Sequence, residues 1–161
     1  NIIFKNKRTY KNEKMADILI KSSHNLKAIN CPSSLNSSAI DEFLLIFLVA
    51  AKAKGVSNFK KLSELNQKES PRLKWGSRIL NKMGVKTVLT KDSIKIYGNP
   101  NLKIKKDIII KDYLKDHRIF MASTIAALTL GGRWKIYDRK CCQTSFPSFI
   151  NKIKKLGAKI Y

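Results

Sequence analysis

The 161-residue sequence has few of the residue types that build several common classes of site. Its three cysteines, Cys31 and the adjacent Cys141 and Cys142, show no CxxC spacing and no nearby histidine, which predicts reduced thiols instead of a zinc site or a disulfide framework. It contains no glycine-rich phosphate loop and no Ser-His-Asp motif. The longest apolar run, residues 43–51, is about half of the roughly 20 residues that a membrane crossing requires, so no membrane partner is expected.

Acidic residues are also scarce. Eleven Asp and Glu face 33 Lys and Arg, which gives a formal net charge of +22. Such an excess can serve nucleic-acid binding, but 27 of the basic residues are lysines scattered over nearly every expected loop and solvated face. We therefore favour a solvated surface, and a basic nucleic-acid-binding module stays as an alternative.

Length and composition predict a single hydrophobic core. With 43% apolar residues the chain can bury a core without a metal or disulfide, as one domain or one lobe of a larger protein. It does not begin with methionine and carries no recognisable secretory signal, so we expect the interior of a longer, cytoplasmic chain.

Two stretches of the sequence show the same order of patterns. The first predicts a buried apolar helix over 40–55 with Ser37 and Ser38 as caps, a second helix with Ser70 as cap and Pro71 at its first position, and strands over 56–59, 86–89 and 93–97.

The second stretch predicts an apolar helix from Asp116 to Gly131, a strand over 134–137 and a helix that ends before Gly157. Asp41 and Asp116 are 75 positions apart, and Gly84 and Gly157 are 73 apart, as an internal repeat requires. We predict an α/β fold of repeated units, roughly 26–98 and 107–161, each ordered helix, strand, helix, strand. Their apolar first helices should pack together beneath sheets, and residues 17–21 should supply a further strand.

Two arginines lie where helix energetics disfavours a cation. Arg72 and Arg118 fall in first helical turns, against the positive end of the macrodipole, and each follows a polar segment. They could bind an anion together with the helix termini, or form structural ion pairs with the neighbouring Glu69 and Asp116, and spacing leaves both open. His117 could orient a loop or exchange protons. Asp41, expected in the first turn of the apolar helix and followed by Glu42, could simply stabilise that terminus.

Four motifs, taken in order, resemble those of one enzyme family. They are Ser38-Ala39-Ile40-Asp41-Glu42, Lys68-Glu69-Ser70-Pro71-Arg72, Asp116-His117-Arg118-Ile119 and Thr144-Ser145-Phe146-Pro147. The sequence is similar to the C-terminal part of 3-phosphoshikimate 1-carboxyvinyltransferases (EPSP synthases), over nearly its whole length. The resemblance implies one incomplete lobe of the family's inside-out α/β barrel, built from βαβαββ units, with the N-terminal lobe of the same enzyme as its partner.

The resemblance also implies an activity and a set of residue roles. The family transfers the enolpyruvyl group of phosphoenolpyruvate to the 5-hydroxyl of shikimate 3-phosphate in aromatic amino acid biosynthesis, without a cofactor. By position, Asp41 matches the general base and a shikimate contact, Glu69 the proton donor, Lys68 a lysine near the shikimate phosphate, and Arg72 and Arg118 the arginines that hold phosphoenolpyruvate. Supporting positions are Asp116, His117 and Thr144, the last marking the family branch with Thr-Ser-Phe-Pro.

A related enzyme is the second candidate. The enolpyruvyl transferase that acts on UDP-N-acetylglucosamine shares the fold, but the Lys-Glu-Ser-x-Arg stretch at 68–72 speaks against it. Because the family members are more than twice as long, we expect this chain to be inactive by itself.

Overall fold

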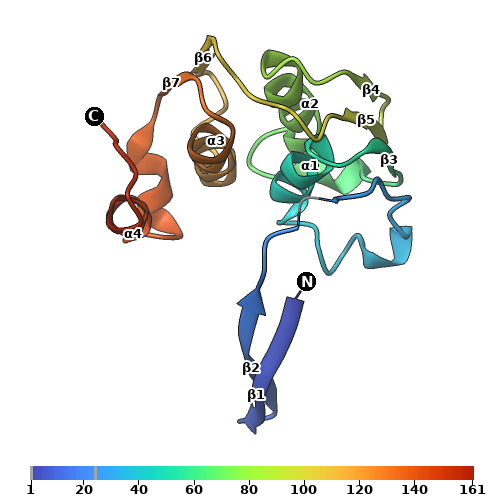
Figure 1. Ribbon diagram of the computed structural model, residues 1–161, viewed down its shortest axis with the longest axis vertical. Helices are drawn as coiled ribbons and strands as arrows, with labels where there is room; N and C mark the ends of the chain where they lie inside the picture. Colours follow the sequence, from blue (N-terminus) through green and yellow to red (C-terminus); the bar gives the residue numbers. More distant parts are fainter. Residues whose placement is uncertain (1, 24) are drawn as a thin grey trace.

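The computed structural model describes residues 2–23 and 25–161 as an α/β fold with a projecting hairpin (Figure 1). The hairpin pairs β1 (Ile2–Tyr10) with β2 (Glu13–Ile20) in antiparallel register and extends away from the remaining elements (Figure 1). The strand expected over 17–21 is thus part of β2, and β1 was not predicted.

The first helix-and-sheet group follows the predicted order. It contains α1 (Phe43–Ala51), β3 (Gly55–Phe59), α2 (Arg72–Lys82), β4 (Thr87–Leu89) and β5 (Ile94–Gly98). The three strands form an antiparallel sheet in the order β3-β5-β4. Alternate side chains of β5 are buried, as expected of a strand with one face on a core.

The second group differs from the first in its sheet. Here β6 (Asp107–Ile110) runs parallel to β7 (Arg133–Ile136), and α3 (His117–Leu130) makes the crossover between them, followed by α4 (Phe149–Lys155). The expected closing strand is absent, since residues 156–161 form no strand, and β6 was not predicted. The unit boundaries 26–98 and 107–161 therefore stay a prediction.

The helices α1, α2 and α3 pack against one another, as predicted for the apolar first helices. Gly76 in α2 makes this approach possible, because a Cβ there would lie 2.7 Å from Cδ2 of Phe47 in α1. Phe43, Phe47 and Phe59 then form an aromatic group in the shared core.

Two helix starts differ from the prediction. α1 begins at Phe43 and not near Ile40, because Ser38 Oγ donates to the Leu35 carbonyl in a turn instead of capping the helix. α2 begins at Arg72 with Pro71 at the N-cap position, because Ser70 Oγ donates to a distant carboxylate instead. Asp41 consequently precedes α1, and Arg72 is the first residue of α2.

Among the described residues, no helix is long and apolar enough to cross a membrane.

Candidate anion-binding site

The buried guanidinium of Arg72 is the centre of an ionic network. Its side chain is only 2% exposed, yet it contacts three carboxylates. Nε donates to Asp116 Oδ2 at 2.8 Å and Nη1 to Asp41 Oδ1 at 2.8 Å, while Nη2 donates to Glu69 Oε2 and, at 3.3 Å, to Asp116 Oδ1. Burial alone would lower the pKa of Arg72, but the hydrogen bond and charge of Asp116, with the charges of Glu69 and Asp41, raise it.

Asp116 anchors this network from the interior. Its side chain is 0% exposed, and besides the two Arg72 bonds it accepts from Ser70 Oγ at 2.8 Å and from the Arg118 backbone N–H at 2.9 Å. Burial alone would raise the pKa of Asp116, but the hydrogen bonds from Arg72 and Ser70 and the Arg72 charge outweigh it, so the pKa lies below its ordinary value. Asp116 is therefore both the N-cap of α3 and the buried counter-ion of Arg72.

Asp41 joins the two predicted arginines. One carboxylate oxygen accepts from Arg72, and the other lies 3.7 Å from Arg118 Nη2. Arg118 Nη1 also donates to the Asp41 carbonyl at 2.9 Å and to Glu42 Oε1 at 2.7 Å. The two guanidinium groups thus share a single carboxylate, although they are 46 positions apart in the sequence.

We call this group the arginine cluster. Its members come from the N-terminal ends of three helices, and they are Arg72, Arg118, Asp41, Glu42, Glu69 and Asp116. The segment that leads into α3 is tightly bent, with Asp112, Leu114 and Lys115 all at positive φ. Such conformations are costly for residues other than glycine. The segment ends at Asp116, whose carboxylate contacts Arg72.

The cluster bears on the structural interpretation of the two arginines, which expected ion pairs with their sequence neighbours. The Arg72–Glu69 ion pair is the one that the structural interpretation expected. Asp116, expected to pair with its neighbour Arg118, pairs with Arg72 instead, and Arg118 pairs with Asp41 and Glu42. The anion-binding interpretation stays a prediction: two guanidinium groups lie beside helix N-termini, a combination that favours anions, and two of their carboxylate partners, Asp41 and Glu69, are exposed.

The remaining predicted residues lie around the cluster, not in it. Lys68 pairs with Glu64, with Nζ 3.5 Å from Oε1, and within the described ranges it has no ion pair to a cluster carboxylate. His117 lines a cavity beside the cluster. Thr144 is exposed and donates to the Cys141 carbonyl at 3.0 Å, so the structure does not bring it to the arginines. Its neighbour Ser145 lines the same cavity as His117.

That cavity, of about 390 Å³, opens beside Arg118. Asp41, Glu42 and Arg118 contribute charged groups to its lining, beside the polar His117 and Ser145. Its apolar walls come from α1, α3 and the region around the start of α4.

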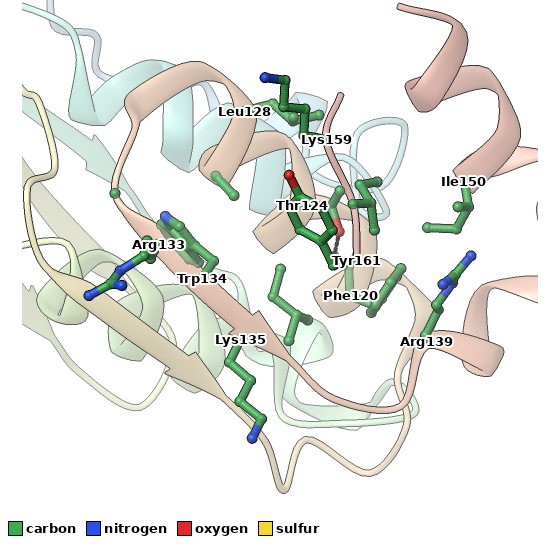
Figure 2. Close-up of a pocket in the computed structure, with 14 residues that line it drawn as sticks. Phe120, Thr124, Leu128, Arg133, Trp134, Lys135, Arg139, Ile150, Lys159 and Tyr161 are labelled. Carbon is green, nitrogen blue, oxygen red and sulfur yellow. Dashed lines mark hydrogen bonds between the residues drawn. The ribbon is translucent and has the colours of Figure 1, made fainter. Parts of the chain in front are cut away.

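A larger cavity, of about 610 Å³, lies elsewhere and contains none of the predicted site residues. Its labelled lining comes from α3, β7, the segment after β7, α4 and the C-terminal residues (Figure 2). The Thr124 hydroxyl in its wall donates to the Phe120 carbonyl within α3 (Figure 2). Of these two cavities, the smaller one is lined by predicted site residues, namely Asp41, His117 and Arg118.

Two members of the site were not assigned a role from the sequence. Glu42 was noted only as the residue after Asp41, and its contact with Arg118 spans 76 positions. Ser70 was predicted to be a helix cap, whereas it supports Asp116. The only sequence signal for Glu42 was the acidic pair at 41–42. The only signal for Ser70, apart from its expected capping role, was the polar segment before Arg72.

Comparisons with known proteins agree with this architecture. The family profile for EPSP synthase (3-phosphoshikimate 1-carboxyvinyltransferase) matches residues 2–153. A relative of that name from Zymomonas mobilis is 38% identical over 161 residues, covering 98% of this chain and 35% of the relative. One from Ruthia magnifica is 37% identical, covering 99% of this chain and 36% of its own length.

Solved structures give the same result for the fold. EPSP synthase from Acinetobacter baumannii superposes with a TM-score of 0.82 at 32% identity, over 96% of this chain and 36% of that one. The enolpyruvyl transferase NikO from Streptomyces tendae superposes with a TM-score of 0.63 at 17% identity, which shows a shared fold alone.

The fold is therefore that of part of an enolpyruvyl transferase-type α/β lobe. More narrowly, the chain belongs to the EPSP synthase family. It spans about a third of the length of the relatives that it matches. The expected fold class is confirmed, and the family is favoured over both alternatives, the UDP-N-acetylglucosamine enzyme and the nucleic-acid-binding module.

Proposed function

We propose that this chain supplies one side of the active site of an enzyme that transfers the enolpyruvyl group of phosphoenolpyruvate to the 5-hydroxyl of shikimate 3-phosphate. The observation that carries the proposal is the Asp41 carboxylate shared between Arg72 and Arg118, with Glu69 on the same Arg72. Two exposed carboxylates next to two guanidinium groups provide proton transfer and anion binding in one place.

The reaction assigns different tasks to the two carboxylates. Asp41 takes the proton of the attacking hydroxyl, whose oxygen bonds to the central carbon of phosphoenolpyruvate. Glu69 delivers a proton to the methylene carbon. Phosphate then leaves with its C–O electron pair, and loss of a proton from the new methyl group restores the double bond. These bond changes and proton transfers require no cofactor.

The cations hold the reacting groups in line. Arg72 and Arg118 bind the phosphoenolpyruvate anion, because a planar guanidinium matches a carboxylate or phosphate through two parallel hydrogen bonds. Lys68 is assigned to the shikimate phosphate, and its present partner Glu64 is a surface residue that it can leave. Asp116 supports the arginine cluster from the interior, and His117 lines the cavity beside it. Thr144 keeps the supporting role that the family resemblance implies, in the segment before α4.

The partner of this chain is the remaining part of the same enzyme. We expect the 161-residue chain alone to show no turnover, because the site is built on one side only and water is not excluded from it. We also propose a cytoplasmic location, for which the three free thiols of Cys31, Cys141 and Cys142 are the support.

A hybrid enzyme tests the proposal. This chain would replace the matching third of the Zymomonas mobilis relative, and phosphate release would be measured with both substrates and with each omitted. Release that depends on both substrates is the expected result. A hybrid that folds, as judged by circular dichroism, but releases no phosphate would contradict it. Glu69→Gln should be folded and inactive, while Glu13→Gln in the hairpin is the matched control.

A further inference from the structure

The Glu42 carboxylate forms an ion pair with Arg118 and does not cap its own helix, α1. It is the N-cap residue of α1, yet its side chain makes no capping hydrogen bond. Its Oε1 accepts from Arg118 Nη1 at 2.7 Å, although the side chain is 54% exposed. A capping role, the ordinary reason for an acidic residue at this position, is therefore not what holds the side chain here.

The arginine cluster carries more negative than positive charge. Four carboxylates surround two guanidinium groups, in a chain that has only eleven acidic residues in all. On Arg118, Nη1 is occupied by the Glu42 carboxylate and the Asp41 carbonyl. An incoming anion that binds through Nη1 therefore displaces the Glu42 carboxylate.

Glu42 is the carboxylate best placed to be displaced. Asp116 is fully buried and accepts four hydrogen bonds, and Asp41 contacts both arginines. Among the described residues, the side chain of Glu42 has a hydrogen bond or ion pair only with Arg118, and Glu42 lines the 390 Å³ cavity together with that arginine. A rotation about its side-chain bonds frees Arg118 without disturbing the buried part of the cluster.

We propose that Glu42 is an internal competitor for Arg118, which occupies the position of the substrate carboxylate and lowers the affinity of the site for phosphoenolpyruvate. The inference rests on the proposed function and adds to it an affinity-determining residue. Glu42 takes no part in proton transfer. It sets how much phosphoenolpyruvate is needed to fill the site.

The test is a titration of the 161-residue chain with phosphoenolpyruvate, followed through the Arg118 side-chain ¹H–¹⁵N signals. Glu42→Gln removes the charge and keeps a hydrogen-bond acceptor, and it should bind about three- to tenfold more tightly, the effect of one like charge a few ångströms from the ligand at the protein surface. Glu13→Gln changes the net charge equally from the exposed hairpin and should leave the affinity unchanged. Glu42→Asp keeps the charge on a shorter side chain, so its affinity for phosphoenolpyruvate should lie between that of the parent and that of Glu42→Gln.

Several outcomes would overturn the inference. One such outcome is that Glu42→Gln binds phosphoenolpyruvate no more tightly than the parent does. A second is that it binds phosphoenolpyruvate more weakly, which would mean that Glu42 merely fixes Arg118. A third is that neither the parent nor Glu42→Gln binds phosphoenolpyruvate. A gain in affinity shared by Glu13→Gln would show a general charge effect instead. Added salt should narrow the difference between Glu42→Gln and the parent, since the competing charge is exposed. Failure of the proposed function is distinct from all of these, because it is read from the absence of phosphate release by the hybrid enzyme.

Discussion

Replacing Asp116 with asparagine should strongly destabilise the fold, because the buried Arg72 guanidinium loses its one fully buried counter-ion. Arg72 and Asp116 are 2% and 0% exposed, so neither can turn to water when its partner is removed. Removing one partner of a buried ion pair costs roughly 3–5 kcal/mol of the free energy of unfolding. Because Arg72 keeps Asp41 and Glu69, we expect the lower end, about 3 kcal/mol.

For a chain of this length that loss corresponds to a decrease in melting temperature of about 6–12 °C. Thermal unfolding followed by circular dichroism measures it. Asp107→Asn is the matched control, because Asp107 also pairs with an arginine, at 3.0 Å from Arg133, but both side chains are exposed. Exposed pairs contribute little, so the control should shift the melting temperature by about 1 °C or less.

The pH dependence of stability provides a second measurement on the same pair of proteins. The pKa of Asp116 is lowered in the folded state, so its contribution to stability is complete above the ordinary value of 3.8 and is lost as the pH falls through the lowered value. The difference between the parent and Asp116→Asn should therefore shrink below pH 3.8 and be constant above it. A variant that melts within about 2 °C of the parent at neutral pH, or a difference that does not change with pH, would refute the assignment of Asp116 as the buried counter-ion.

Three further predictions concern the proposed chemistry and the core. In the hybrid enzyme, Asp41→Ala and Glu69→Gln should each lower turnover by at least about 100-fold while substrate binding largely survives, and a near-parental rate in either variant would remove that residue from its role. Arg118→Lys should chiefly raise the KM for phosphoenolpyruvate, because an ammonium group cannot reproduce the planar fork; an unchanged KM in steady-state kinetics would count against it. Gly76→Ala should lower the free energy of unfolding by about 1–3 kcal/mol in a urea titration, since the new Cβ would lie 2.7 Å from buried Phe47, and a stabilised variant would show that the helices can separate.

The sequence predicted the local structure best where several signals agreed. The strands at 56–59 and 93–97 and the helix that ends before Gly131 combine apolar periodicity with clear breakers, and all three are present. Helix starts were less predictable. Ser38 and Ser70 are residue types that cap helices, but their hydroxyl groups donate elsewhere, to partners that only the folded chain brings near.

The residues of the candidate site were predictable, but their pairing was predictable only in part. Arg72 and Arg118 were noticed because cations in first turns oppose the helix dipole. The Arg72–Glu69 pair, three positions apart, was expected from the sequence. The contacts with Asp41 and that of Arg72 with Asp116 join residues 31 to 77 positions apart, which periodicity and spacing do not encode. Glu42 escaped assignment for that reason, and the catalytic roles of Asp41 and Glu69 stay predictions until the hybrid is assayed.

Exposure within the arginine cluster separates the part that maintains the fold from the part that can do chemistry. The side chains of Asp116 and Arg72 are 0% and 2% exposed, that of Arg118 is 29%, and those of Asp41, Glu69 and Glu42 are 44%, 53% and 54%. A buried ion pair is costly to break, whereas exposed carboxylates exchange partners at little cost. Arg72 lies at the boundary, since its Nε faces the buried carboxylate and its Nη1 and Nη2 also face exposed ones. One guanidinium can therefore stay fixed in the core while the carboxylates on its outer side give way to a substrate, which is what a preorganised anion site requires.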